Sequence, residues 1–393
     1  MPKQKKPIFK KRLSLLILYF LGFLIALSVA LPAYIQSNFL NEFVTLETLS
    51  LFFIGANTLT VFCIFVFPRL IKKLSNFFLT KIILILLGVS LLGLVIANNP
   101  WSAFLSTILF TISTNLLWIN MDILIETFSS NSSTGKTRTI YFTFINLGWV
   151  LAPSLSSYLI KLGNYQLSFL VAALIIIPVF FIFIYKDKHL KNKVTCSKEK
   201  INTVIKRTWT NKNLRGIFCI ALILQLFYST AVVYLPIYLY QNMGIGWESL
   251  GLMFSFMLLP FLIFEIPAGV IADKYIGEKE ILFLGFFILA LSLFLFFYLK
   301  TNAFWVWTAV LFLSRIGASL IEAMRETYFF KIVDAKDVGH INIFRTTAPL
   351  GYIIGPALAM VILAFLPLNY LFLIVGLIVF GGMGFVWSLK DTK

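Results

Sequence analysis

Charged residues are scarce in this 393-residue sequence, and acidic residues are about half as common as basic ones. Only 12% of residues are charged and 60% are hydrophobic, with 16 Asp and Glu against 33 Lys and Arg. Apolar runs of about 20 residues recur along the chain, and a helix of that length crosses the ~30 Å hydrocarbon core of a bilayer. The composition therefore excludes a soluble globular protein and indicates an integral membrane protein.

Residues that build disulfides and metal sites are also few. The three cysteines make no disulfide framework, and Cys63 and Cys219 lie in apolar runs. His189 and His340 lack metal-ligand spacing, and residues 133–137 match only the end of a phosphate-binding loop, without its first glycine or a preceding strand. We therefore expect no metal site, no cofactor, no coupling to ATP and no enzymatic activity.

Twelve apolar runs have the length of membrane spans, six on each side of a basic segment. We expect an all-α protein with an N-terminal six-helix bundle (1–185), a basic cytoplasmic linker (186–215) and a C-terminal six-helix bundle (216–393). The first run is longer than the core of a signal peptide and is expected to remain. The predicted spans are 13–35, 49–67, 79–97, 101–125, 139–160, 165–185, 216–240, 249–271, 280–299, 303–329, 341–366 and 369–389.

The basic residues agree with this topology. If both termini and every second loop face the cytoplasm, 29 of the 33 Lys and Arg lie on that side, and Arg345 is counted among them. Lys161 and Lys300 lie on the other side. This excess of basic residues on the cytoplasmic side is what the positive-inside rule requires. Loop charge of this kind explains the net charge of +17 without a nucleic-acid partner. We expect a multi-pass protein of the cell membrane, with cytoplasmic termini and membrane lipids as partners.

The two halves show internal repetition. The segments 147–153 (LGWVLAP) and 350–356 (LGYIIGP) match at an offset of 203, and small residues in them would allow close helix contact. At an offset of 200, residues of the fourth and tenth spans also correspond. The pairs are Asn115 with Arg315, Asp122 with Glu322, and Glu126 with Glu326. The halves are therefore predicted to be diverged copies of one six-helix unit.

A loop motif carries a family resemblance. The segment 265–279 (EIPAGVIADKYIGEK) resembles the G-x-x-x-D-[RK]-x-x-G-x-[RK] motif of the major facilitator superfamily, between the eighth and ninth spans. The corresponding first-half loop, 67–73, keeps the cations but lacks the Asp and the glycines. The resemblance implies alternating access around a cavity lined by helices 1, 4, 7 and 10. It also implies a cytoplasmic latch, with a close helix contact at Gly269, built from Glu265, Gly269, Asp273, Lys274, Gly277 and Lys279.

Ionisable residues within the spans are the candidate functional groups, because each is costly in a bilayer. At 100° per residue, Arg315, Ser319, Glu322 and Glu326 share one face of the tenth span. In one interpretation Arg315 binds an anionic or polar substrate group and Asp122 or Glu322 carries a coupling proton, since a partly desolvated carboxylate can cycle between charged and neutral forms. In the other, these residues and Glu326 form ion pairs that close a cytoplasmic gate.

The remaining polar residues of the spans have two interpretations. They either line the cavity or form hydrogen bonds between helices. The expected substrate-binding residues are Arg315, Asn115, Trp118, Ser319, Gln225 and Tyr228, and further cavity candidates are Tyr19, Ser28, Gln36, Ser229 and Tyr234.

The resemblance implies a secondary transporter of a small organic solute, and the carboxylates favour proton coupling over sodium coupling. Export is one direction that the sequence leaves open. We expect a monomer whose partners are the substrate, a proton and lipid. The alternatives are an uncoupled uniporter and a non-transporting receptor or lipid-handling protein on the same fold.

Overall fold

A computed structural model describes residues 5–128, 134–186, 201–333 and 338–390. Those residues form helices joined by short connections, and they contain no strand. Twelve of the helical segments are long and apolar enough to cross a membrane. Helices satisfy their own backbone hydrogen bonds, which the hydrocarbon core cannot do. The predicted all-α fold of twelve spans in two six-helix halves is therefore confirmed.

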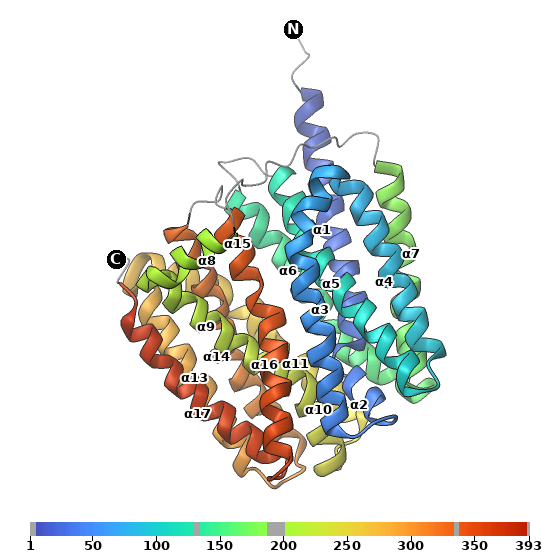
Figure 1. Ribbon diagram of the computed structural model, residues 1–393, viewed down its shortest axis with the longest axis vertical. Helices are drawn as coiled ribbons and strands as arrows, with labels where there is room; N and C mark the ends of the chain where they lie inside the picture. Colours follow the sequence, from blue (N-terminus) through green and yellow to red (C-terminus); the bar gives the residue numbers. More distant parts are fainter. Residues whose placement is uncertain (1–4, 129–133, 187–200, 334–337, 391–393) are drawn as a thin grey trace.

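The N-terminal half begins at the upper end of the bundle in Figure 1, which we call the N-terminal end. The chain then alternates between this end and the opposite, distal end. The helices of this half are α1 (Lys5–Ala33), α2 (Gln36–Asn41), α3 (Leu46–Lys73), α4 (Asn76–Ile96), α5 (Pro100–Phe128), α6 (Thr134–Leu162) and α7 (Tyr165–Lys186).

The C-terminal half repeats this path and ends near the same level. The expected linker 186–215 lies partly outside the described residues, and its described part contains a helix of ten residues and the start of the seventh span. The elements are α8 (Ile201–Thr210), α9 (Lys212–Ser229), η2 (Thr230–Tyr234), α10 (Leu235–Ile237), η3 (Tyr238–Asn242), α11 (Trp247–Ile263), α12 (Glu265–Ile271), η4 (Ala272–Ile276), α13 (Glu278–Tyr298), α14 (Phe304–Ile332), α15 (Val338–Arg345), α16 (Thr347–Leu363) and α17 (Asn369–Ser388).

Prolines break three spans in ways that the apolar runs did not show. The first span turns after Pro32 and continues through α2 to Asn41, six residues beyond its predicted end. In the seventh span, Pro236 has no N–H to donate, and π-helical turns lie on both sides of it. In the eighth, Pro267 cannot donate to the carbonyl of residue 263, and the helix breaks between α11 and α12.

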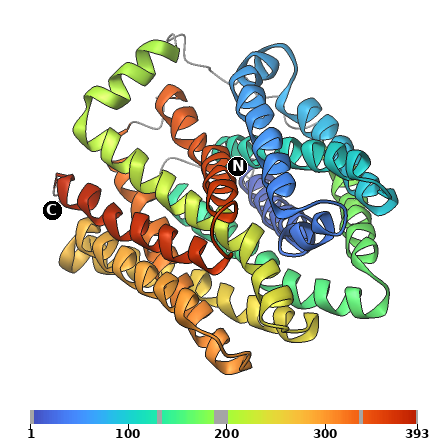
Figure 2. The same cartoon turned by 60° about the horizontal axis from the view of Figure 1, so that its bottom comes forward.

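The two halves lie side by side and meet along two pairs of helices (Figure 2). Helix α3 packs on α16, and α6 packs on α11. Within each half, a glycine of the repeated segment sits against a neighbouring helix. An added Cβ at Gly148 would lie 2.9 Å from backbone atoms of α1, and one at Gly351 would lie 2.5 Å from Gln225 of α9. The close approach predicted from the repeated small residues is therefore present in both halves.

Candidate functional site: a charged cavity between the halves

A cavity of about 500 Å³ lies between the two halves. The N-terminal half lines it with α3, α5, α6 and Tyr34, which directly follows α1. The C-terminal half lines it with α9, η2, α11, α12, α14, α15 and α16. The four expected spans thus contribute, the first of them through Tyr34, and the second, fifth, eighth and eleventh spans contribute as well.

Eight of the nine residues predicted for substrate binding, proton coupling or a gate line this one cavity. The lining residues among them are Asn115, Trp118, Asp122, Gln225, Tyr228, Arg315, Glu322 and Glu326. Ser319 is the exception, since it is fully buried and its hydroxyl donates to the carbonyl of Ile316 (3.0 Å). It occupies the edge of the predicted helix face, and its short side chain bonds its own backbone instead of facing the cavity.

The five further polar candidates are not among the residues that line the cavity. Three of them form hydrogen bonds between helices, as in the second interpretation, whereas Ser229 bonds its own helix and Tyr19 packs on a neighbouring ring. Ser28 donates to the carbonyl of Ala172 (2.8 Å), Gln36 donates to Thr107 (3.2 Å), Ser229 donates to the carbonyl of Leu226 (2.9 Å), Tyr234 bonds Ser50 (2.6 Å) and Tyr19 stacks on Phe144 (5.9 Å between centroids).

Arg315 is a buried cation that faces the cavity. It is 1% exposed, and its guanidinium lies over the ring of Phe227, 4.9 Å from the centroid. Tyr34 and Tyr352, from opposite halves, lie close enough to interact with it electrostatically. Neither Nη1 nor Nη2 has a hydrogen-bond partner among the described residues. Two strong donors of this arginine are therefore available to a bound group.

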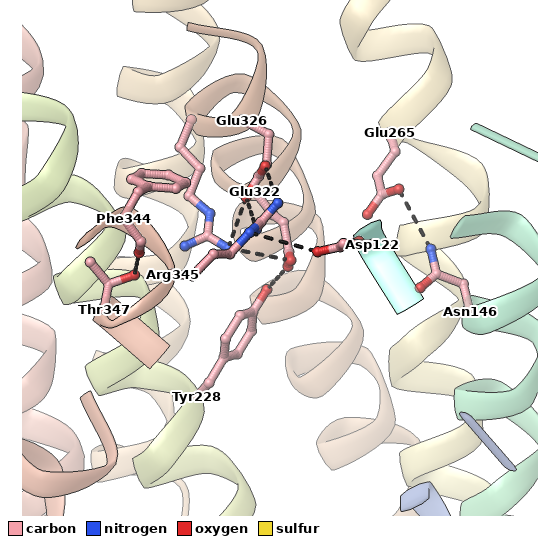
Figure 3. Close-up of polar contacts among 10 residues, drawn as sticks. Asp122, Asn146, Tyr228, Glu265, Glu322, Glu326, Phe344, Arg345 and Thr347 are labelled. Carbon is pink, nitrogen blue, oxygen red and sulfur yellow. Dashed lines mark hydrogen bonds and ion pairs between the residues drawn. The ribbon is translucent and has the colours of Figure 1, made fainter. Parts of the chain in front are cut away.

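A second arginine, Arg345, holds together carboxylates from the two halves (Figure 3). Its Nη1 and Nη2 donate to the two oxygens of Glu326, at 2.8 and 3.2 Å, in a bidentate pair. Its Nε lies 3.8 Å from Asp122 of α5. Arg345 and Glu326 belong to the C-terminal half and Asp122 to the N-terminal half. This ion pair therefore crosses the interface.

Arg345 was counted with the charges of the cytoplasmic side and was not predicted as a site residue, although it lies within the predicted span 341–366. It is the last residue of α15 and lies within the span Gly339–Leu363, on the wall of the cavity. The pair with Glu326 holds it there. A count of loop charges could not distinguish it, because the sequence does not show that a short helix precedes α16.

Glu322 completes the cluster. It accepts a hydrogen bond from the hydroxyl of Tyr228, and it lies 3.5 Å from Nη2 of Arg325. Arg325 is almost fully buried and also lies 3.8 Å from Glu326. Both cations of this cluster are thus paired with carboxylates, in contrast to Arg315.

Glu265, expected in the loop latch, lines the cavity instead. It is the first residue of α12, directly after the helix break at Phe264 that separates α12 from α11. Within the described residues, the side-chain amide of Asn146 of α6 donates a hydrogen bond to Glu265, at 3.5 Å (Figure 3). No cation pairs with this carboxylate among the described residues. Glu265 is thus a second ionisable group of the cavity without a partner of opposite charge.

The other expected latch residues lie at the N-terminal end, within one half. An added Cβ at Gly269 would meet no atom within 4 Å, so the close helix contact expected there is absent from this structure. The backbone of Asp273 belongs to η4, and its side chain lies outside the described part of the chain. Lys274 is exposed.

The end of the motif starts the next helix. Gly277, with φ of 90°, precedes α13 in a conformation that favours glycine. Lys279 donates to the carbonyl of Leu389 (3.2 Å). Glu278 is buried and pairs with Lys331 of α14. These contacts join helices of the C-terminal half and do not link it to the other half.

The repeat extends to the walls of the cavity. At the offsets found in the sequence, equivalent residues of the two halves line it together. These pairs are Asn115 with Arg315, Asp122 with Glu322, Phe142 with Arg345, Ile145 with Ala348, and Trp149 with Tyr352. The cavity is therefore built on a pseudo-two-fold arrangement.

Contacts between the halves close the distal end of the cavity. Ser154 and Ser255 share a hydrogen bond (2.7 Å), and Ser157 donates to the carbonyl of Trp247. An exposed ion pair joins Lys161 and Glu248. Tyr34 packs on Phe254, with ring centroids 5.1 Å apart.

Two repeated six-helix halves around a central cavity form the architecture of a membrane transporter. The family model described as Major Facilitator Superfamily matches residues 13–258 and 217–393, so the chain belongs to this superfamily. The structure is similar to that of a POT family transporter in complex with 5-aminolevulinic acid, with a TM-score of 0.77 and 14% identity over 95% of each chain. At that identity the likeness shows the fold. A comparison with curated proteins gave no match.

Proposed function

We propose that this membrane transporter is a secondary active carrier, which moves a small organic solute by alternating access and couples it to protons. The observation that carries the proposal is the guanidinium of Arg315. It lies in the central cavity, 1% exposed, with two nitrogen atoms that have no partner among the described residues. A charge held in this way is costly unless a ligand completes its bonding.

The contrast with the other arginines supports a binding role over a gating role. Arg325 and Arg345 each contact carboxylates, as residues of a gate would. Arg315 contacts the ring of Phe227 and lies beside two tyrosines. An anionic or strongly polar group of a solute would supply the missing acceptors. Asn115, Trp118, Gln225 and Tyr228 would then contact the rest of the solute.

The closed distal end supports an orientation. We propose that both termini are cytoplasmic in the cell membrane, in agreement with the positive-inside distribution. The cavity would then be reached from the cytoplasm while the contacts of Ser154, Ser157 and Tyr34 seal the opposite side. Breaking these contacts and joining the halves at the N-terminal end would expose the cavity to the outside. The working unit would be a monomer in lipid.

Asp122 is the carboxylate best placed to couple protons to this movement. It is the residue through which the N-terminal half meets Arg345, at 3.8 Å. A proton on Asp122 would remove its charge and leave Arg345 bound only within the C-terminal half. Protonation would thereby weaken the link between the halves. Glu322, which corresponds to Asp122 in the sequence repeat, would be the alternative proton carrier.

The test begins with thermal stabilisation of the purified protein by a broad panel of small organic acids, amines and neutral solutes. Compounds that stabilise the wild type and fail to stabilise Arg315→Ala would identify the substrate class. The Glu322→Gln variant runs beside it. Hits that survive both changes would contradict the assignment of Arg315 to the substrate site.

The hits are then added to sealed liposomes that contain the protein and a pH-sensitive dye. We expect solute movement to change internal pH in the wild type. Asp122→Asn should keep solute exchange and lose the accumulation driven by a pH gradient. Flux without any pH response would instead show a uniporter, and binding without flux would show a receptor.

A further inference from the structure

We infer that the solute is amphoteric, with an acidic group that binds Arg315 and an amine that binds Glu265. This inference rests on the proposed function and deepens it. It is carried by two ionisable side chains that line the same cavity and lack partners of opposite charge among the described residues.

The acidic pole of the solute would lie at Arg315. The two free Nη atoms can donate to both oxygens of a carboxylate, the geometry that arginine recognises best. Tyr34 and Tyr352 lie beside the guanidinium and carry hydroxyl donors of their own. No acidic residue is paired with Arg315 in the described part of the chain, so an incoming anion has no competitor to displace.

The basic pole would lie at Glu265. Its single hydrogen bond from the described residues comes from the amide of Asn146 at 3.5 Å, longer than a normal bond of this kind, although a carboxylate can accept about four. Glu322 and Glu326 act on Glu265 electrostatically and add to the negative potential there. Figure 3 shows Glu265 facing this group across Asp122. A primary ammonium would bring three donors to this place.

The balance of charge around the cluster agrees with a cation site. Asp122, Glu322 and Glu326 contact the guanidinium groups of Arg325 and Arg345, and Glu265 lines the same cavity beside Asn146. Four acidic side chains are therefore gathered at this end of the cavity. The other end carries the positive charge of Arg315. A solute with one charge of each sign would complement both ends at once.

The spacing of the two poles sets the length of the solute. Arg315 and Glu322 are seven residues apart on α14, which corresponds to about 10 Å along the helix axis. Glu265 lines the same cavity, and Figure 3 shows its side chain on the side where Asp122 and Glu322 lie. The cavity walls also carry Trp118, Phe142 and Trp149. The arrangement favours an acid and an amine joined by a chain of several carbon atoms over an α-amino acid.

A homologous series of ω-amino carboxylic acids tests the inference. Binding of 4-aminobutyrate, 6-aminohexanoate and 8-aminooctanoate to the full-length protein in lipid nanodiscs would be measured by calorimetry, with hexanoate, hexylamine and the α-amino acid norleucine as comparisons. We expect one of the longer amino acids to bind at least ten-fold more tightly than any comparison compound.

The variants assign each pole. Arg315→Gln should reduce the affinity for the amino acid to that for hexylamine, and Glu265→Gln should reduce it to that for hexanoate. Lys300→Gln and Glu280→Gln, which remove exposed charges outside the cavity, should leave the affinities unchanged. Thermal unfolding of each variant, with Arg315→Lys as the variant that retains the charge, would establish that it is folded.

Several results would overturn the inference. Equal binding of hexanoate and the amino acids, an unchanged preference in Glu265→Gln, or no binding by the whole series would each do so. The proposed function fails differently, by the absence of net flux in sealed liposomes. Proton-linked flux of a solute with only an acidic group would retain the proposed function and reject the amphoteric assignment.

Discussion

Gly148 and Gly351 occupy equivalent positions in the two halves, and each allows its helix to pack closely on the first membrane span of its own half. Asn115 and Arg315 are also equivalent, yet they differ by a full charge. Asn115 donates to the carbonyl of Thr111, whereas two nitrogen atoms of Arg315 have no hydrogen-bond partner in the described part of the chain. The close helix contacts are thus retained in both halves, while the polar residues at equivalent positions differ. Packing tolerates little change at a close helix contact, whereas a residue on a cavity wall can change with no loss of packing.

The difference assigns separate tasks to the halves. Among the described residues that line the cavity, the N-terminal half contributes one charged side chain, Asp122. The C-terminal half contributes Glu265, Arg315, Glu322, Glu326 and Arg345. The C-terminal half therefore carries the groups that can select a charged solute. The N-terminal half supplies aromatic walls and the single carboxylate through which it contacts the other half's charge network.

The largest effect is expected where the halves are alike. Gly351→Val would place a Cβ 2.5 Å from Gln225, and Gly148→Val would place one 2.9 Å from backbone atoms of α1. Each should lower stability by about 1–3 kcal/mol through overpacking, with Gly351→Val the more severe. Thermal unfolding in detergent measures the effect, and Gly384→Ala, whose Cβ would meet no atom within 4 Å, is the control. If only one of the two valine variants is destabilised, the two glycine contacts are not equivalent.

A smaller loss is expected in the charge network of the C-terminal half. Arg345→Gln removes the bidentate partner of Glu326, in a pair whose side chains are 24% and 26% exposed. The loss should be about 1–2 kcal/mol, less than for a fully buried pair. Arg345→Lys should restore only part of it, because an ammonium cannot form the bidentate contact. Unfolding temperatures equal to that of the wild type would show that the pair adds no stability.

The link between the halves should affect conformation more than stability. The 3.8 Å contact between Asp122 and Arg345 is long, so Asp122→Asn should change stability by less than about 1 kcal/mol. Spin labels at the exposed positions Lys73 and Lys274, on opposite halves, would report the separation of the N-terminal ends in a cysteine-free background. We expect a broader distance distribution in the variant. An unchanged distribution would exclude this contact as a link.

The smallest effect is expected at the distal end. Lys161 and Glu248 form an ion pair across the halves, but their side chains are 64% and 67% exposed. Water and salt screen such a pair. Glu248→Gln should therefore leave both the unfolding temperature and the solute exchange rate unchanged. A clear loss would assign to this pair a role in closing the cavity that its exposure does not support.

The sequence predicted the spans well because an apolar helix of fixed length is the main solution that a bilayer permits. It also predicted that Arg315, Glu322 and Glu326 share a face, which follows from the helical period. The period could not resolve Ser319, whose hydroxyl reaches its own backbone. Nor could it separate cavity residues from helix contacts, since Gln36 and Gln225 are both amides in apolar runs, and only the second lines the cavity.

Two cavity residues were missed for a different reason. Glu265 follows a helix break, and Arg345 ends a short helix before another begins. In both places the direction of the chain depends on tertiary packing around the break. The prolines at positions 260 and 267 indicate that a break can occur, but they do not give the orientation of the next turn. A cation close to a predicted span end was the one available signal for Arg345.

The serine hydroxyls at the distal end have a thermodynamic consequence for the opening of the protein. Ser154, Ser157 and Ser50 join the halves there through hydrogen bonds. Each such bond contributes only about 0.5–1.5 kcal/mol net, because water can take the place of the lost partner. An interface of interlocked aliphatic side chains would expose apolar area on separation and resist it more strongly. The hydroxyl bonds themselves can therefore part and reform at little cost in free energy. Most of the cost of opening this end comes instead from the apolar contacts beside them, such as Tyr34 on Phe254 and Tyr165 on Trp247.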